Sequence, residues 1–142
     1  MKTMALQVSG NLLMTVHGPD PMTDPEKQEC LDALKGVDLD TVRALVYTKG
    51  GGPTAAQRKA LQDAYGGRTV PTAILCEGPL VRGMVTAMSW FNPSIRAFPT
   101  TEIDSALKYL EVPQDRWDHI RREVTRLLRD VESASGKPAS GG

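Results

Sequence analysis

The sequence predicts an α/β fold in which a mixed central sheet of about five strands carries packed helices and is followed by an added C-terminal amphipathic helix. Short apolar, partly β-branched segments alternate with segments of helical periodicity, which implies right-handed crossovers in a parallel or mixed sheet. The chain of 142 residues is 40% hydrophobic and 24% charged. That size and composition are typical of one globular domain.

The first part of the chain is predicted to form a β-hairpin and a helix. A two-residue turn at Gly10-Asn11 joins apolar strands over residues 6–9 and 12–16. Residues 25–34 then place apolar side chains on one helical face, with a capping Thr or Asp just before them and a glycine just after.

Alternating strands and helices follow, separated by glycine- or proline-containing loops. The predicted strands cover residues 42–47, 70–76 and 95–98, and the predicted helices cover residues 54–65, 80–91 and 102–110. Residues 1–111 are therefore expected to be an α/β domain.

A further helix is predicted over residues 114–132. Trp117, Ile120, Val124 and Leu127 recur at steps of three and four and form one apolar stripe. Basic and acidic residues balance on the other faces, so the helix is not a basic arm. The chain divides accordingly into residues 1–111, a C-terminal amphipathic helix within 112–132, and a tail over 133–142 whose composition predicts disorder.

The composition argues against several classes of function. With 17 basic and 17 acidic residues the net charge is zero, so no global field attracts nucleic acid. No apolar run reaches the roughly 18 residues of a membrane span. Polar residues interrupt the apolar N-terminal stretch, so no signal peptide is expected and the cytoplasm is the expected location.

The reactive side chains are too sparse to predict a catalytic or metal site. Cys30 and Cys76 lack metal-ligand spacing and are expected to be reduced, partly buried thiols. His17 and His119 stand apart from each other, and His17 is interpreted as a solvated loop residue. We therefore expect no enzyme, no catalytic residues, no metal and no cofactor.

The glycine-rich loop from Lys49 to Arg58, between a predicted strand and the next predicted helix, is the sharpest local feature. One interpretation is a tight turn from strand to helix, capped by Thr54. The other is an anion site, because glycines allow close backbone approach and the helix begins with free N–H groups. The candidate residues for an anion or phosphorylation site are Lys49, Gly50, Gly51, Gly52, Thr54 and Arg58.

The helix predicted over residues 80–91 is apolar on more than one face. It therefore has more apolar surface than packing against one sheet would bury. The C-terminal helix covers the surplus in one interpretation. In the other, one of these surfaces meets a protein partner or a second copy of the chain. The candidate contact residues are Met84, Met88, Trp90, Phe91, Trp117, Ile120, Val124 and Leu127.

Two stretches, residues 84–98 (MVTAMSWFNPSIRAF) and 101–110 (TEIDSALKYL), give this chain a resemblance to a known family. Together with the order of elements over about residues 4–111, they resemble the STAS domain of bacterial anti-sigma factor antagonists, in its SpoIIAA-like branch. In that family, phosphorylation of a Ser or Thr between strand and helix controls partner binding. The matching place here holds Thr48 and Thr54, and the family's Asp-Ser-x-Gly pattern is absent.

These observations predict a non-enzymatic regulatory or protein-interaction module. Its predicted surface is the glycine-rich loop together with the helix over residues 80–91. A module for a small anionic or lipid-like ligand is the alternative, with the ligand held at the loop or beside Trp90. A third interpretation is an assembly subunit that uses the C-terminal helix.

Overall fold

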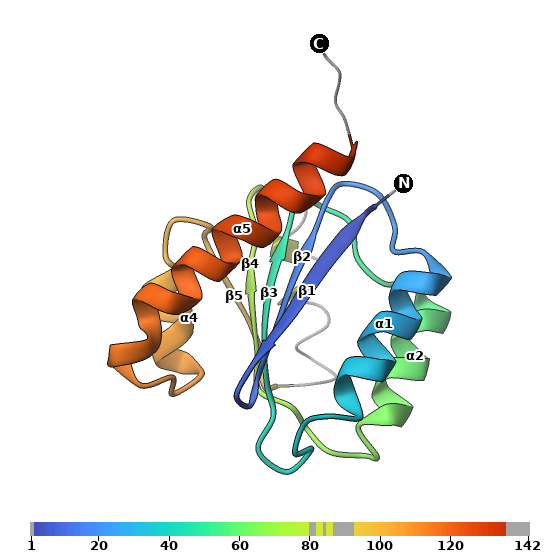
Figure 1. The fold of residues 1–142 in the computed structure, drawn as a ribbon, viewed down its shortest axis with the longest axis horizontal. Coiled ribbons are helices and arrows are strands. Elements are labelled where there is room, and N and C mark those ends of the chain that lie inside the picture. Colours follow the sequence, from blue (N-terminus) through green and yellow to red (C-terminus); the bar gives the residue numbers. More distant parts are fainter. Residues whose placement is uncertain (1, 80–81, 84, 87–92, 136–142) are drawn as a thin grey trace.

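The computed structural model describes residues 2–79, 82–83, 85–86 and 93–135, which form a five-stranded mixed sheet in the order β1-β2-β3-β4-β5 (Figure 1). Strands β1 and β2 form an antiparallel hairpin, and β2 through β5 run parallel. The elements are β1 (Met4–Ser9), β2 (Leu12–His17), α1 (Asp24–Leu34), β3 (Arg43–Thr48), α2 (Ala55–Ala64), β4 (Thr72–Leu75), β5 (Ile95–Phe98), α4 (Ile103–Tyr109), a 3-10 turn (Gln114–Arg116) and α5 (Trp117–Ser135).

The predicted fold class is confirmed, and the predicted strands and helices other than the one over residues 80–91 are present with small differences at their ends. Two expectations differ in outcome. The helix predicted over residues 80–91 lies largely outside the described residues. The tail was expected to be disordered from residue 133, but α5 continues through Ser135.

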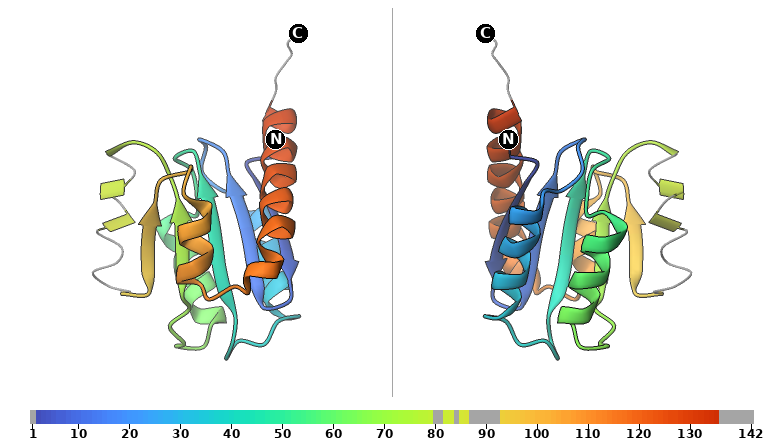
Figure 2. Two further views of the ribbon diagram at one scale, coloured as in Figure 1. Left: turned by 90° about the vertical axis from the view of Figure 1, so that its left-hand side faces the viewer. Right: turned by 90° about the vertical axis from the view of Figure 1, so that its right-hand side faces the viewer.

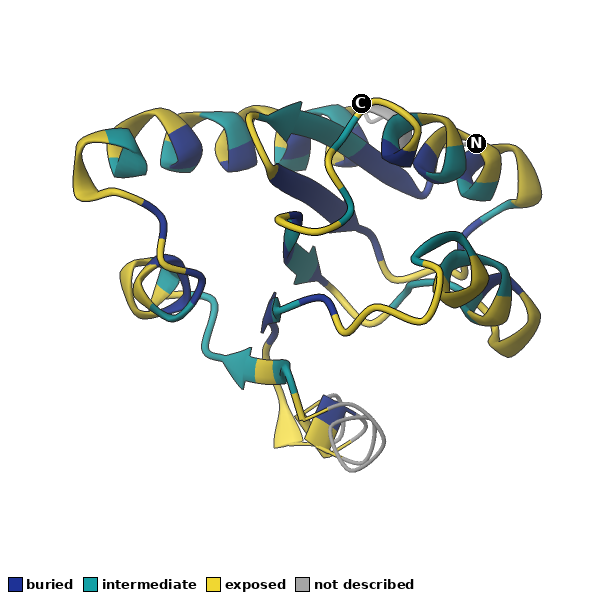
Figure 3. Ribbon diagram, turned by 90° about the horizontal axis from the view of Figure 1, so that it is seen from below, coloured by how far each residue is buried: buried dark blue, intermediate teal, exposed yellow. Residues whose placement is uncertain are grey.

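Helices cover both faces of the sheet. Figure 2 shows α4 and α5 across one face and α1 and α2 across the other. Buried residues gather along the strands and on the helix sides turned toward them, while exposed residues lie on the outward sides (Figure 3). Strand β2 is buried along its whole length, as expected for a strand with neighbours on both edges and helices on both faces.

The apolar stripe of α5 is part of the main core. Ile120, Val124 and Leu127 are buried against the β2 side chains Leu12 and Met14 and their neighbours. This corrects the expectation that the three residues contact a partner, because a surface enclosed by its own sheet has no free face.

Trp117 begins α5 at the rim of this core. Its ring is half-buried, and its indole Nε1 donates a hydrogen bond to the Val112 carbonyl at 2.9 Å. The link fastens the start of the helix to the segment that leads into it. Helix α5 therefore completes the core of the domain rather than standing apart from it.

A buried carboxylate, that of Glu26 on α1, ties the N-terminal strand to this helix. It accepts hydrogen bonds from the backbone N–H groups of Thr3 (2.8 Å), Met4 (3.0 Å) and Thr23 (3.0 Å), and from both threonine hydroxyls. Burial raises the pKa of this carboxyl, but the bonds to its charged form outweigh burial and lower the pKa to about 2. Ionised Glu26 therefore stabilises the folded state.

Replacing Leu127 by Ala is expected to lower the free energy of unfolding by about 2–5 kcal/mol, because the change leaves a cavity beneath α5. Leu127 is 1% exposed. Urea unfolding followed by circular dichroism measures the effect. Leu128→Ala is the control with a smaller expected loss, since Leu128 is only partly buried. Unchanged stability of the Leu127 variant, with a changed mass in ultracentrifugation, would restore the interpretation of this stripe as a partner surface.

Replacing Glu26 by Gln is expected to lower the free energy of unfolding at pH 7 by about 2–3 kcal/mol, because an amide nitrogen cannot accept a hydrogen bond. The folded-state pKa of Glu26 is depressed from 4.5 to about 2, so its stabilisation is present above pH 4.5 and is lost as the pH falls toward 2. Urea unfolding at a series of pH values should show the two proteins converging in acid.

The matched control for this substitution is Glu29→Gln, at an exposed position of the same helix. It should leave the unfolding curve at pH 7 nearly unchanged. If the Glu26 and Glu29 variants lose equal stability, the buried hydrogen bonds are not what ties β1 to α1.

Candidate functional site

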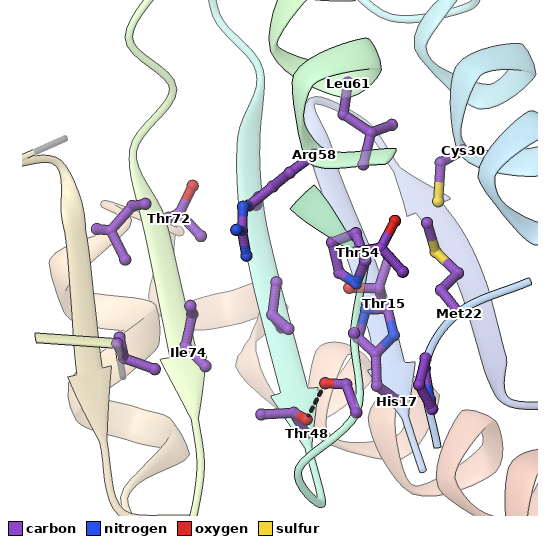
Figure 4. Close-up of a pocket in the computed structure, with 18 of the residues that line it drawn as sticks. Thr15, His17, Met22, Cys30, Thr48, Thr54, Arg58, Leu61, Thr72 and Ile74 are labelled. Atoms are coloured by element: carbon purple, nitrogen blue, oxygen red, sulfur yellow. Dashed lines mark hydrogen bonds between the residues drawn. The ribbon is translucent and has the colours of Figure 1, made fainter. Parts of the chain in front are cut away.

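A pocket of about 400 Å³ lies on the face of the sheet that carries α1 and α2 (Figure 4). Its floor is made by alternate side chains of β2, β3 and β4, because every second residue of a strand points to the same face. Most of the floor and walls is apolar, with Ala44, Val46 and Ile74 from the strands and Leu61 from α2. The volume falls within the range typical of small-molecule sites.

The glycine-rich loop forms one rim of the pocket by pairing with the loop after β2. The Gly51 N–H donates to the Gly18 carbonyl at 2.9 Å, and the Met22 N–H donates to the Gly52 carbonyl at 2.9 Å. A Cβ at Gly51 would lie 2.1 Å from the Asp20 carbonyl oxygen. Only glycine fits there, so this close approach is to the protein's own backbone.

The other two glycines of the loop meet conformational demands. Gly50 and Gly52 have φ values of 121° and 152°, which side chains disfavour. The Gly50 N–H donates to the Thr48 hydroxyl at 2.9 Å, and that hydroxyl donates to the Gly51 carbonyl at 2.7 Å. The N–H groups of Gly50 and Gly51 therefore have partners within the protein.

The capping role predicted for Thr54 is confirmed. Its hydroxyl accepts from the Gln57 N–H at 3.3 Å, and the Gln57 side chain accepts from the Thr54 N–H at 2.9 Å. The Gln57 amide also donates to the Met22 carbonyl and to Asp24, each at 2.9 Å. The start of α2 is thereby fixed against the loop after β2.

The two cations predicted for this site, Lys49 and Arg58, lie in different places in the structure. Lys49 pairs with Glu132 of α5 and does not line the pocket. Arg58 lines the pocket and extends from α2 over the strands (Figure 4). Within the described part of the chain its guanidinium has no hydrogen-bond or ion-pair partner. Arg58 is thus a half-buried cation beside an apolar cavity, with its pairing capacity unused.

His17 is a pocket residue, which corrects its interpretation as a solvated loop residue. It is the last residue of β2 and only 4% exposed. Burial lowers the pKa of its imidazole to about 4, against an opposing effect of the Glu26 charge, so the ring is neutral at pH 7. Its Nδ1 is shielded from solvent and has no hydrogen-bond partner among the described residues.

Thr15 lies beside His17 in the close-up and is a second pocket residue that the sequence analysis missed (Figure 4). The signal was the alternation Leu13, Thr15, His17 along β2, which places all three side chains on one face. Extending the predicted strand by one residue would have put His17 in the sheet instead of in the following loop.

The remaining partner candidates belong to the helix predicted over residues 80–91. Met84, Met88, Trp90 and Phe91 lie outside the described residues. Val85, between them in sequence, is 5% exposed and lines the pocket, where it packs against Ile74 and Cys76.

Within the described ranges, no helix has the length and apolar character needed to cross a membrane. Three or more His, Cys, Asp or Glu side chains nowhere gather as a metal site in this part of the chain.

No model of a known protein family matches the sequence, and no curated protein matches it. Among solved structures, the chain is similar to an uncharacterised protein of the DUF3478 family from Shewanella loihica PV-4, described as having a SpoIIAA-like fold. The identity is 20% and the TM-score 0.53, and the match covers 75% of this chain and 91% of that one. The resemblance in sequence, the order of elements and this structural match agree that the chain is an α/β domain with a SpoIIAA-like fold.

Proposed function

We propose that this protein is a non-enzymatic binding module whose pocket takes a small molecule with an apolar body and an anionic head. The observation that carries the proposal is Arg58, a cation without a partner among the described residues at the edge of an apolar cavity. Partly desolvated cations are stabilised by an anionic partner, and a guanidinium pairs well with carboxylate or phosphate.

Two further features support an anionic head at this end of the ligand. Thr54 lines the pocket, so the positive end of α2 lies at the same wall. The strand residues beneath Arg58 are apolar, and an alkyl chain or a ring bound in the pocket covers them. A compact inorganic ion leaves the same surface exposed to water. Together they favour an amphipathic anion over free phosphate.

The chemistry of the pocket favours binding over catalysis. Burial, with added repulsion from Glu29 and Glu26, raises the pKa of the Cys30 thiol to about 11, so it stays protonated and is a poor nucleophile. The imidazole of His17 accepts no proton near neutral pH and is hydrogen-bonded to no nucleophile among the described residues. An activated nucleophile needs such a base.

The second candidate function is a protein-interaction module, which the SpoIIAA-like fold favours. Its surface is the helix predicted over residues 80–91 with Met84, Met88, Trp90 and Phe91, next to the glycine-rich loop. In this proposal the apolar side chains of the segment contact one specific partner protein.

The ligand proposal predicts that octanoate and decanoate bind in the pocket and that Arg58→Gln weakens binding about tenfold or more, because a hydrogen-bonded charge pair is lost. Isothermal titration calorimetry measures affinity, and amide NMR shifts of Thr15, Val46 and Ile74 locate the ligand. Arg129→Gln, at an exposed position of α5, is the matched control and should bind normally. Equal binding of decyltrimethylammonium would contradict an anionic head, and unmoved pocket shifts with millimolar decanoate would end the proposal.

The interaction proposal predicts that Trp90→Asp or Met88→Asp abolishes capture of one specific protein from the native host while leaving the thermal unfolding midpoint unchanged. Affinity capture read by mass spectrometry tests it. Capture that persists in both variants, or variants that unfold, would count against a partner surface at this segment.

A further inference from the structure

Two polar side chains interrupt the apolar floor of the pocket without meeting a protein partner. Thr15 and His17 lie two residues apart on β2, so both point to the pocket face, and they are 8% and 4% exposed. Neither side chain has a hydrogen-bond partner in the described part of the chain, and the Nδ1 of His17 is also shielded from solvent. Of these polar atoms, the Nδ1 of His17 is the one shown to be both shielded and unpaired, and such an atom destabilises the folded state.

Other threonines around the pocket make the contrast clear. The Thr72 hydroxyl donates to the Val70 carbonyl at 3.0 Å, and the Thr48 hydroxyl is paired with the glycine-rich loop. The Thr54 hydroxyl caps α2. Among these four threonines, Thr15 alone keeps its hydroxyl unpaired, and it lies directly beside His17 (Figure 4).

We propose that Thr15 and His17 form a subsite for an uncharged hydrogen-bonding group, such as a hydroxyl, carried by the same ligand whose anionic head pairs with Arg58. This inference rests on the proposed ligand function and narrows its chemistry. The ligand is then a bifunctional molecule, such as a hydroxylated carboxylate, and not a plain fatty acid.

The electrostatics of β2 select an uncharged group. His17 is neutral at pH 7, and the negative charge of the buried Glu26 carboxylate acts on it and disfavours a second anion there. A neutral imidazole offers one donor and one acceptor, and a threonine hydroxyl offers both. A hydroxyl group, which also donates and accepts, is complementary to this pair.

Arg58 and the pair of Thr15 and His17 face the proposed ligand from different walls of the pocket. Arg58 comes from α2, whereas Thr15 and His17 belong to the sheet floor. The two kinds of polar contact lie apart in Figure 4, with apolar strand residues around them. A ligand that meets both is held in one orientation, because a head-to-tail reversal takes its charge away from Arg58.

The test compares hexanoate, octanoate and decanoate with their ω-hydroxy counterparts and with the dicarboxylates of equal length. Isothermal titration calorimetry on the full chain gives the affinities. For the best-fitting length, the hydroxy acid is expected to bind about fivefold to tenfold tighter than the plain acid, as one added hydrogen bond predicts. The nitrogen NMR shifts of the His17 ring should move with the hydroxy acid and much less with the plain acid.

Thr15→Val is the main variant, because valine keeps the shape of the side chain and removes only the hydroxyl. It should lose most of the preference for the hydroxy acid over the plain acid. Thr125→Val, at an exposed α5 threonine outside the pocket whose hydroxyl is already paired, is the matched control and should keep that preference. Circular dichroism confirms that each variant is folded.

Each other outcome counts against the subsite in its own way. If the plain and hydroxy acids bind wild type equally, the subsite is wrong while the pocket proposal stands. A hydroxyl preference that survives in Thr15→Val places the contact elsewhere. Tightest binding of the dicarboxylate overturns the uncharged character of the subsite. Binding of none of the probes overturns the subsite and the proposed function together.

Discussion

Strand β2 is the constraint on which the rest of the structure depends. It pairs with β1 on one edge and β3 on the other, and helices lie over both of its faces. One set of alternate side chains, with Met14 at its centre, is enclosed by α5 in the main core. The other set, which includes Thr15 and His17, forms the floor of the pocket. Because successive residues of a strand point to opposite faces, one face of β2 packs in the core and the other lines the pocket.

The pocket keeps its shape because its rim is held by backbone contacts. The loop after β2 and the glycine-rich loop after β3 are joined through Gly51 and Gly18, at a separation that excludes any side chain at Gly51. Glu26 fixes the start of β1 to α1, and the Thr54 cap fixes the start of α2. Such a frame allows the few polar groups inside the pocket to remain unpaired, since the surrounding contacts maintain the fold without them.

Unpaired polar groups are unusual inside a folded domain, because burial without a partner is unfavourable. The Nδ1 of His17 is such a group, and Arg58 and Thr15, whose side chains also lack a protein partner among the described residues, line the same cavity. In our proposal, an external ligand supplies the missing partners. A ligand with one charge and one uncharged polar group satisfies them together.

The sequence by itself determined the element order, the mixed sheet and the Thr54 cap, because periodicity, capping and turn chemistry act over a few neighbouring residues. It did not reveal the pocket, because His17, Thr48 and Arg58 come together only when β2, β3 and α2 pack. The same limit explains why the surroundings of the glycine-rich loop and of the α5 stripe could not be predicted. The glycines after β3 meet a loop about 30 residues earlier in sequence, and the stripe of α5 finds its place on β1 and β2. Periodicity shows that a face is apolar, and only tertiary packing decides what covers it.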